Sequence, residues 1–193
     1  MIKTACAFTG HRPKSFSWGY DESAPGCVLL KEVLAAQISA LAEQGVTDFL
    51  SGMAQGVDLW CAQIVLDLKK KNPALKLHAI LPCEGQESKW SVSAREIYHS
   101  ILEQADKVVY VGQEYSRGCM LGRNRYMVDH SSILLAVYNG TDRSGTGMTV
   151  RYAQQLKKEL YILDPVTRDV THEPANVDAV SSKKPVEIFP SMC

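Results

Sequence analysis

Short apolar segments alternate with amphipathic segments along most of this chain, and this alternation is what most constrains its fold. Apolar runs bounded by Gly, Pro, Ser or Asn have the length and composition of buried strands; they cover residues 5–8, 48–50, 77–81, 108–111, 133–138 and 160–163. Between them, the spacing of apolar residues predicts helices over 28–44, 57–71, 91–104, 123–132 and 147–158. Strands and helices in strict alternation form right-handed βαβ units. We therefore predict an α/β fold with a doubly wound, mainly parallel sheet of about six strands and helices on both faces.

Length and composition fit one compact domain. The chain has 193 residues, of which 46% are hydrophobic and 22% charged, which disfavours disordered, fibrous and membrane classes. We predict a domain over residues 1–165 and a peripheral tail over 166–193, where the periodicity is lost. The apolar runs are short for a membrane span and the N-terminus does not resemble a signal peptide. We therefore expect a cytoplasmic protein with no membrane partner.

The charge balance and the spacing of the cysteines disfavour further classes of function. Lys plus Arg and Asp plus Glu both total 21, which argues against a strongly basic scaffold that grips nucleic acid by charge alone. The six cysteines form no CxxC pair and have no histidine at zinc-ligand spacing. We expect reduced, mostly structural thiols and no metal site. Cys83 follows a predicted strand, and packing is favoured over chemistry for it.

Glycines, hydroxyls and arginines follow most of the predicted strands. Because loops after parallel strands open on one edge of the sheet, these residues should line one cleft there. The candidate binding residues are Thr9, Gly10, Arg12, Ser51, Gly52, Gly56, Asp58, Arg123, Asn124, Gly145, Thr146, Gly147 and Thr149. The sequence therefore predicts a ligand site at the carboxyl edge of the sheet.

Two glycine-containing turns at predicted helix starts favour an anion. Gly52 and Gly56 let the backbone approach a ligand and present free N–H groups, as a phosphate cradle does. The segment 144–149 repeats this arrangement, although such turns also occur as ordinary loops. Arg12 and Arg123 are the cationic candidates for phosphate, with a solvated surface charge as the alternative for either. Asp58 either caps its helix or accepts a ribose hydroxyl, and for Trp60 core packing is favoured over base stacking.

Several familiar catalytic motifs do not occur in this sequence. G-x-G-x-x-G does not follow the first strand, and the chain contains no G-x-x-x-x-G-K-[ST], H-E-x-x-H or G-x-S-x-G. These absences disfavour the usual dinucleotide fingerprint, Walker-type NTPases, zinc peptidases and α/β-hydrolases. Of the five histidines, His11 falls on the predicted ligand edge.

Three segments together resemble a known family. Thr9-Gly10-His11-Arg12-Pro13, the run from Ser51 to Trp60, and Arg123-Asn124-Arg125 resemble the YpsA-like branch of the SLOG superfamily, which also includes DprA/SMF and LOG proteins. The resemblance covers roughly residues 1–165. It implies a Rossmann-like sheet with a site for nucleotides or nucleotide-derived ligands at its carboxyl edge, and a homodimer as one possible assembly.

The resembled families differ in what this site does. In DprA-like proteins, residues matching Ser51, Gly52, Ala54, Gly56 and the 123–125 segment line a pocket used for single-stranded DNA. In LOG-like enzymes, a Gly-Thr turn followed by Glu belongs to a site that cleaves nucleoside monophosphates. Here the corresponding turn is followed by Val150, Arg151 and Tyr152, which argues against that hydrolase activity.

We therefore rank three functions. The first is a binding module or sensor for a nucleotide-derived small molecule, such as ADP-ribose, another NAD derivative or an AMP-like ligand. The second is a base-releasing hydrolase of the LOG type, for which Asp58, Glu84 and Glu87 are the remaining carboxylates near the edge and Glu84 is the best placed. Single-stranded nucleic-acid binding ranks third, because the net charge is zero and the sequence has no basic and aromatic stripe.

Overall fold

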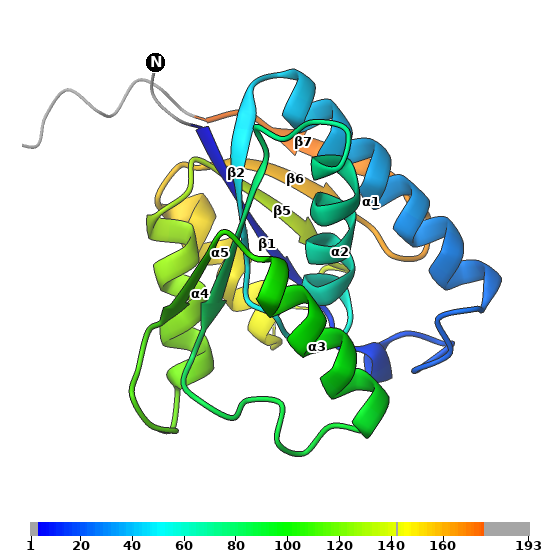
Figure 1. The fold of residues 1–193 in the computed structure, drawn as a ribbon. Coiled ribbons are helices and arrows are strands. Elements are labelled where there is room, and N and C mark those ends of the chain that lie inside the picture. The colour runs from blue at the N-terminus through cyan, green and yellow to red at the C-terminus, as the bar shows by residue number, and fades with distance from the viewer. Residues whose placement is uncertain (1–3, 142, 176–193) are drawn as a thin grey trace, which may run out of the picture.

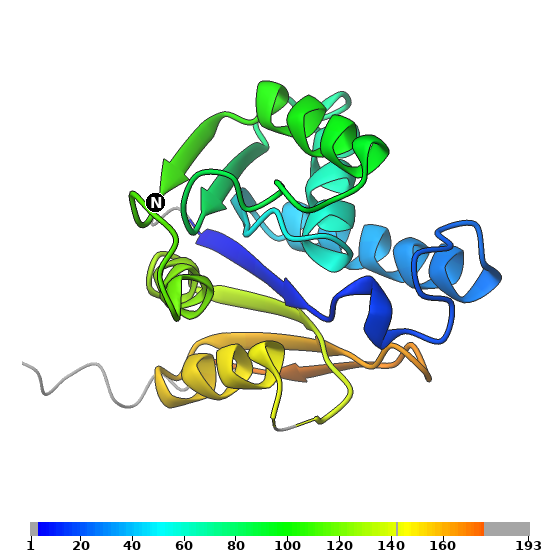
Figure 2. The same ribbon diagram turned by 90° about the horizontal axis from the view of Figure 1, so that it is seen from below.

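The fold is a seven-stranded sheet between two layers of helices, described by a computed structural model over residues 4–141 and 143–175. Helices α1, α2 and α3 cover one face of the sheet, and α4 and α5 cover the other (Figures 1 and 2). The strands are β1 (Thr4–Gly10), β2 (Val46–Ser51), β3 (Lys76–Leu81), β4 (Lys107–Tyr110), β5 (Ile133–Val137), β6 (Glu159–Leu163) and β7 (Val170–Glu173). The helices are α1 (Pro25–Glu43), α2 (Val57–Lys69), α3 (Val92–Gln104), α4 (Cys119–Asp129) and α5 (Gly145–Gln155), with a short 3₁₀ turn, η1 (Pro13–Ser15).

The strand order is β4-β3-β2-β1-β5-β6-β7, and β1 to β6 are parallel. The chain winds outward from β1 to β4 and then returns to place β5 on the other side of β1. Cys6 pairs with Ile133 and Gly10 with Val137, so β1 and β5 end at the same level. In such sheets the crevice at the carboxyl ends of the strands flanking this reversal is where ligands bind. The predicted α/β, doubly wound fold is confirmed.

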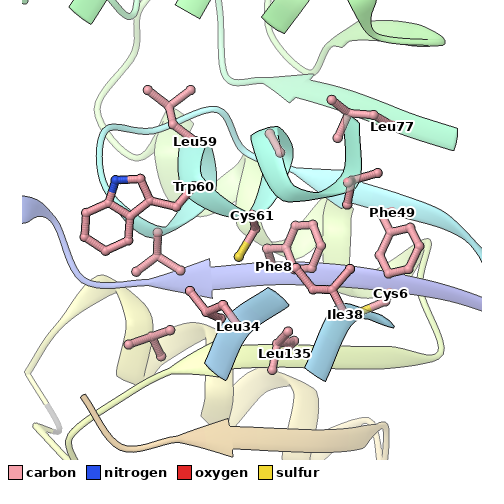
Figure 3. Close-up of a cluster of buried hydrophobic side chains, with 14 of the residues drawn as sticks. Cys6, Phe8, Leu34, Ile38, Phe49, Leu59, Trp60, Cys61, Leu77 and Leu135 are labelled. Atoms are coloured by element: carbon pink, nitrogen blue, oxygen red, sulfur yellow. The ribbon is translucent and has the colours of Figure 1, made fainter. Parts of the chain in front are cut away.

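Side-chain alternation along the central strands divides the core into two layers. Phe8 faces α1 and α2 and stacks on Phe49 with ring centroids 5.8 Å apart, while the small side chain of Ala7 faces α4 and α5. Figure 3 shows the first layer, in which Leu34 and Ile38 of α1 lie against these strands. These two hydrophobic layers hold the helices on both faces of the sheet in place relative to its carboxyl edge.

α1 is apolar enough to resemble a membrane span. It has 19 residues and a mean hydropathy of 1.3, which meets the length and composition of a bilayer-crossing helix. The described residues contain no second helix of this kind. One side of α1 is buried in the core through Cys27, Leu30, Leu34, Ile38 and Leu41, while Val28 and Leu29 near its start are exposed.

The structure departs from the predicted elements near the C-terminus. β7, which pairs antiparallel with β6, extends the sheet beyond residue 165 into the expected tail. Val170, Thr171 and His172 are exposed, so the strand carries little of the apolar signal on which the prediction relied. Residues 176–193 of that expected tail lie outside the described residues.

The described cysteines are free thiols. Cys6, Cys27, Cys61 and Cys83 are buried and Cys119 is half-buried, while Cys193 lies outside the described residues. Burial, reinforced by the neighbouring Cys119 thiol, raises the pKa of the Cys83 thiol. A protonated thiol is a poor nucleophile, so the structure favours the packing role for Cys83.

Candidate functional site

A cavity of about 230 Å³ lies at the carboxyl ends of β1 and β5. We call it the edge cavity. It is lined by Thr9, Gly10, His11, Arg12, Ser15, Ala54, Asp58, Met120, Arg123, Asn124, Ser144, Gly145 and Thr146. These residues come from the loops and helix starts that follow β1, β2, β4 and β5. Of the candidate binding residues, Ser51, Gly52, Gly56, Gly147 and Thr149 lie outside this lining and the others lie in it.

The loop between β2 and α2 is held in shape by its own polar groups. The Ser51 hydroxyl donates to the Asp58 carbonyl at 2.8 Å and accepts the Met53 N–H at 3.1 Å. Met53 is fully buried with a φ of 56°, an uncommon backbone conformation for a residue with a side chain. Ser51 is fully buried and outside the cavity lining, so its hydroxyl positions the loop.

Arg123 connects α4 to the loop after β2. It is 3% exposed, and its Nη1 donates to the Gly52 carbonyl and, at 3.4 Å, to the Ile80 carbonyl, while Nε donates to Asn124 Oδ1 at 2.8 Å. Burial lowers the pKa of Arg123, an effect opposed by the Asp58 carboxylate. A guanidinium remains protonated in proteins even so. These polar contacts therefore hold α4 against β3 and the loop after β2.

Asp58 faces Arg123 from the first turn of α2. Its Oδ2 lies 3.9 Å from Arg123 Nη1 and accepts the Ala54 N–H at 3.4 Å. Burial raises the pKa of the Asp58 carboxyl, while Arg123, Arg12 and the Ala54 N–H act in the opposite direction. The carboxylate thus faces the edge cavity from within an ion pair.

Two of the predicted glycines allow close packing beside the cavity. A Cβ on Gly52 would overlap Arg123 Nη1 and lie 2.6 Å from Asp58 Oδ2. A Cβ on Gly10 would lie 2.5 Å from Cβ of Val57, so that glycine sets the distance between β1 and α2. Gly52 therefore makes room for the ion pair and does not itself line the cavity.

The N-terminus of α5 forms another wall of the edge cavity. The Ser144 hydroxyl accepts the Gly147 N–H at 3.0 Å and donates to the Thr141 carbonyl at 2.9 Å, so it caps the helix. Gly145 and Thr146 line the cavity, whereas Gly147 is buried in the helix. Thr149 accepts a hydrogen bond from Asn124 Nδ2 at 2.9 Å and joins α5 to α4.

Gly56 and Arg125 point away from the edge cavity. Gly56 precedes α2 with a φ of 92° and lines a different cavity, on the side of α2 and α3. Arg125 is exposed, and its guanidinium lies 5.5 Å from the ring centre of Tyr152. The site therefore takes Arg123 and Asn124 from that segment. Trp60 is buried, with its Nε1 donating to Glu22 at 2.8 Å, in line with the favoured core role.

The structure adds residues that the sequence reasoning left out of the binding set, namely His11, Ser15, Ala54, Met120 and Ser144. His11 Nε2 donates to Asn139 Oδ1 at 2.9 Å, and burial lowers the pKa of its imidazole. His11 follows β1 directly, which was the signal that placed it on the ligand edge. Met120 lies in the first turn of α4, ahead of the predicted helix start, because Gly118 begins that helix in a left-handed conformation.

Electrostatically, the cavity favours an anion. Arg12 and Arg123 face it with one acidic residue, Asp58, among the described lining residues. α2, α4 and α5 all begin at this edge, and helix N-termini contribute partial positive charge. Glu84, the carboxylate favoured from sequence, is exposed and lies outside the lining.

Two proteins are similar to this chain in sequence. UPF0398 protein BH1768 of Halalkalibacterium halodurans is 36% identical over 135 residues, covering 69% of this chain and 70% of the relative. The SPbeta prophage-derived protein YoqJ of Bacillus subtilis is 33% identical over 159 residues, covering 73% of this chain and 91% of the relative.

A solved structure shares the fold. DNA processing protein A of Helicobacter pylori, described for its single-stranded DNA binding mode, superposes with a TM-score of 0.56 at 21% identity, covering 83% of this chain and 65% of that one. The sequence model of the YpsA family, described as the YspA SLOG family, matches residues 6–170. The chain therefore belongs to the YpsA family of SLOG proteins.

Proposed function

We propose that the edge cavity binds the phosphate-bearing part of a nucleotide-derived small molecule, such as ADP-ribose, another NAD derivative or an AMP-like ligand. The observation that carries this proposal is the convergence of Arg12, Arg123 and the first residues of α5 on one cavity. The first amides of a helix lack intrahelical partners, and Gly145 and Thr146 occupy those positions here. Such amides, together with a guanidinium, form a favourable phosphate site.

Arg12 and Arg123 have different roles in this proposal. Arg123 is fixed by the carbonyls of Gly52 and Ile80, so it provides a preorganised positive charge in the lining of the cavity. Arg12 precedes η1 and is half-buried, so its guanidinium can reorient toward a bound phosphate. Arg12 is therefore the residue whose removal tests binding with the smaller effect on the fold.

The alternative functions lack comparable support. A base-releasing hydrolase needs a carboxylate that is free to stabilise the developing charge or activate water, and Asp58 is held by Arg123 and the Ala54 N–H. Single-stranded DNA binding is named for the Helicobacter neighbour, but the chain here has equal numbers of acidic and basic residues. Binding of a DNA oligonucleotide, measured beside the small molecules, tests this second alternative.

Binding is tested by calorimetry and thermal shift with inorganic phosphate, ribose 5-phosphate, AMP, ADP-ribose, NAD and a thymidine oligonucleotide. A small-molecule ligand at 100 times its Kd should stabilise the protein by about 2.7 kcal/mol. We expect Arg12→Gln to weaken phosphate ligands about tenfold, because a hydrogen bond to a charged group contributes about 1.5–3 kcal/mol. Lys14→Gln is the matched control, since Lys14 is an exposed cation two residues away and outside the cavity lining.

Two results would contradict the proposal. One is the lack of binding by every phosphate-bearing small molecule at millimolar concentration. The other is tight, salt-dependent binding of the oligonucleotide with no response to AMP or ADP-ribose, which would favour the nucleic-acid function.

A further inference from the structure

A second and larger cavity lies close to the edge cavity. Its volume is about 690 Å³, and it is bounded by the loop before α1, by α2 and by the start of α3. We call it the α2–α3 cavity. The edge cavity, at about 230 Å³, is smaller than the roughly 300–1,000 Å³ typical of small-molecule sites. It has room for a sugar phosphate, and the remainder of a nucleotide needs additional space.

A thin ridge separates the two cavities. Arg12 lines the edge cavity while the next residue, Pro13, lines the α2–α3 cavity. In the same way, Ala54 lines the edge cavity and Gly56 lines the α2–α3 cavity. The two segments touch, because a Cβ built on Gly56 would lie 3.0 Å from Cδ of Pro13 and 3.1 Å from the carbonyl oxygen of His11. One layer of backbone therefore separates the linings of the two cavities.

The α2–α3 cavity has the lining of a site for an uncharged, flat group. Leu59, Ile64 and Ile97 supply apolar surface, and Gln55 and Gln63 contribute amide groups. The charged groups of the lining are paired: Lys31 Nζ lies 2.5 Å from Glu22 Oε2, and Asp67 Oδ1 lies 2.7 Å from Lys70 Nζ. An apolar cavity with a few polar groups and neutralised charges suits a nucleobase better than a second phosphate.

We propose that the α2–α3 cavity holds the base of the ligand whose phosphate occupies the edge cavity, with the sugar crossing the Pro13–Gly56 ridge. This inference rests on the proposed function and defines its ligand as a base-containing nucleotide rather than a sugar phosphate. A ligand without a base should therefore lose the contacts with the α2–α3 cavity and keep the phosphate contacts in the edge cavity.

The test compares ligands with and without a base on variants that fill one cavity. Ala94 lies in the first turn of α3 and lines the α2–α3 cavity, so Ala94→Phe should fill that cavity without touching the other. Ser100→Phe is the matched control, because Ser100 is exposed on the same helix and lies outside both linings. The ligands are ribose 5-phosphate and the four nucleoside 5′-monophosphates, measured by calorimetry.

We expect at least one nucleoside monophosphate to bind the unmodified protein ten times more tightly than ribose 5-phosphate. Ala94→Phe should remove that advantage and leave the affinity for ribose 5-phosphate within twofold, and Ser100→Phe should change neither. Equal affinity for ribose 5-phosphate and every nucleotide, or an advantage that survives in Ala94→Phe, would overturn this inference while the proposed function stands. Failure of all these ligands to bind would overturn both.

A second measurement does not depend on the folding of a variant. An azido-purine nucleoside monophosphate should photolabel peptides from residues 55–67 or 91–97 in the unmodified protein, as mapped by mass spectrometry. Labelling confined to residues 119–127 or 144–150, which flank the edge cavity, would place the base elsewhere and overturn the inference.

Discussion

Arg123 of α4 and Asp58 of α2 form a buried pair in the lining of the edge cavity, with Nη1 and Oδ2 3.9 Å apart. Their helices lie on opposite faces of the sheet, so the pair joins the two layers around the carboxyl edge. Arg123 also donates to the carbonyls of Gly52 and Ile80. The same guanidinium therefore stabilises the fold and supplies charge to the cavity.

The first prediction concerns the stability supplied by this pair. We expect Arg123→Ala to lower the free energy of unfolding by about 3–5 kcal/mol, because it leaves a buried carboxylate unpaired. Arg125→Ala is the control: its side chain is exposed over Tyr152, and its loss should cost at most about 1 kcal/mol. Urea unfolding of both variants measures the difference. Similar small losses for the two arginines would show that the pair contributes little to the fold.

The second prediction concerns two glycines that should respond in opposite directions. A Cβ at Gly52 would overlap the Arg123 guanidinium, so Gly52→Ala should cost about 1–3 kcal/mol through overpacking. Gly122, within α4, would place its Cβ in open space, so Gly122→Ala should add up to about 1 kcal/mol through helix propensity. Thermal unfolding of the two variants reports the sign of each effect. A stabilised Gly52→Ala protein would contradict the close packing described here.

The strand and helix pattern was sufficient to predict the sheet because the strands from β1 to β6 carry apolar side chains between turn residues. It did not reveal β7, where Val170 is followed by three polar residues and the strand pairs through its backbone with β6. Backbone pairing does not require apolar side chains, so the hydrophobicity pattern of the sequence does not reveal such a strand. The predicted fold was therefore correct, while the extent of the sheet was not.

The edge of the sheet that holds the cavity was likewise predictable, because all loops after parallel strands open there. The direction of individual polar side chains was not. Ser51 looks like a ligand residue, yet its hydroxyl satisfies the buried loop that it belongs to. Arg123 lies between Gly122 and Asn124 in the sequence. Its burial follows from contacts with the carbonyls of Gly52, after β2, and Ile80, in β3, which are far away in the chain. Long-range hydrogen bonds of this kind leave no local signature.

The third prediction concerns pH. Burial lowers the pKa of His11 from its usual 6.5, so the unfolded chain binds the proton first as the pH falls. The stability that neutral His11 contributes is therefore present above about pH 6.5 and decreases as the pH falls toward the lowered pKa of the folded state. We expect His11→Gln to show a weaker loss of stability between pH 7.5 and pH 5.5 in urea titrations. His99→Gln, a change at an exposed histidine of α3, is the control, and equal slopes for the unmodified protein and His11→Gln would refute the prediction.

The last prediction separates binding from catalysis. Cleavage of an N-glycosidic bond requires a carboxylate placed against the ribose, and in the described part of the lining that group is Asp58, already paired with Arg123. Replacing its ion pair with a contact to the ribose would leave Arg123 without its buried counter-charge. We therefore expect purified protein to bind AMP without releasing adenine over many hours, as followed by chromatography. If adenine is released over multiple turnovers and the release is abolished by Asp58→Asn but not by Glu84→Gln, the protein is an enzyme with Asp58 as its catalytic carboxylate.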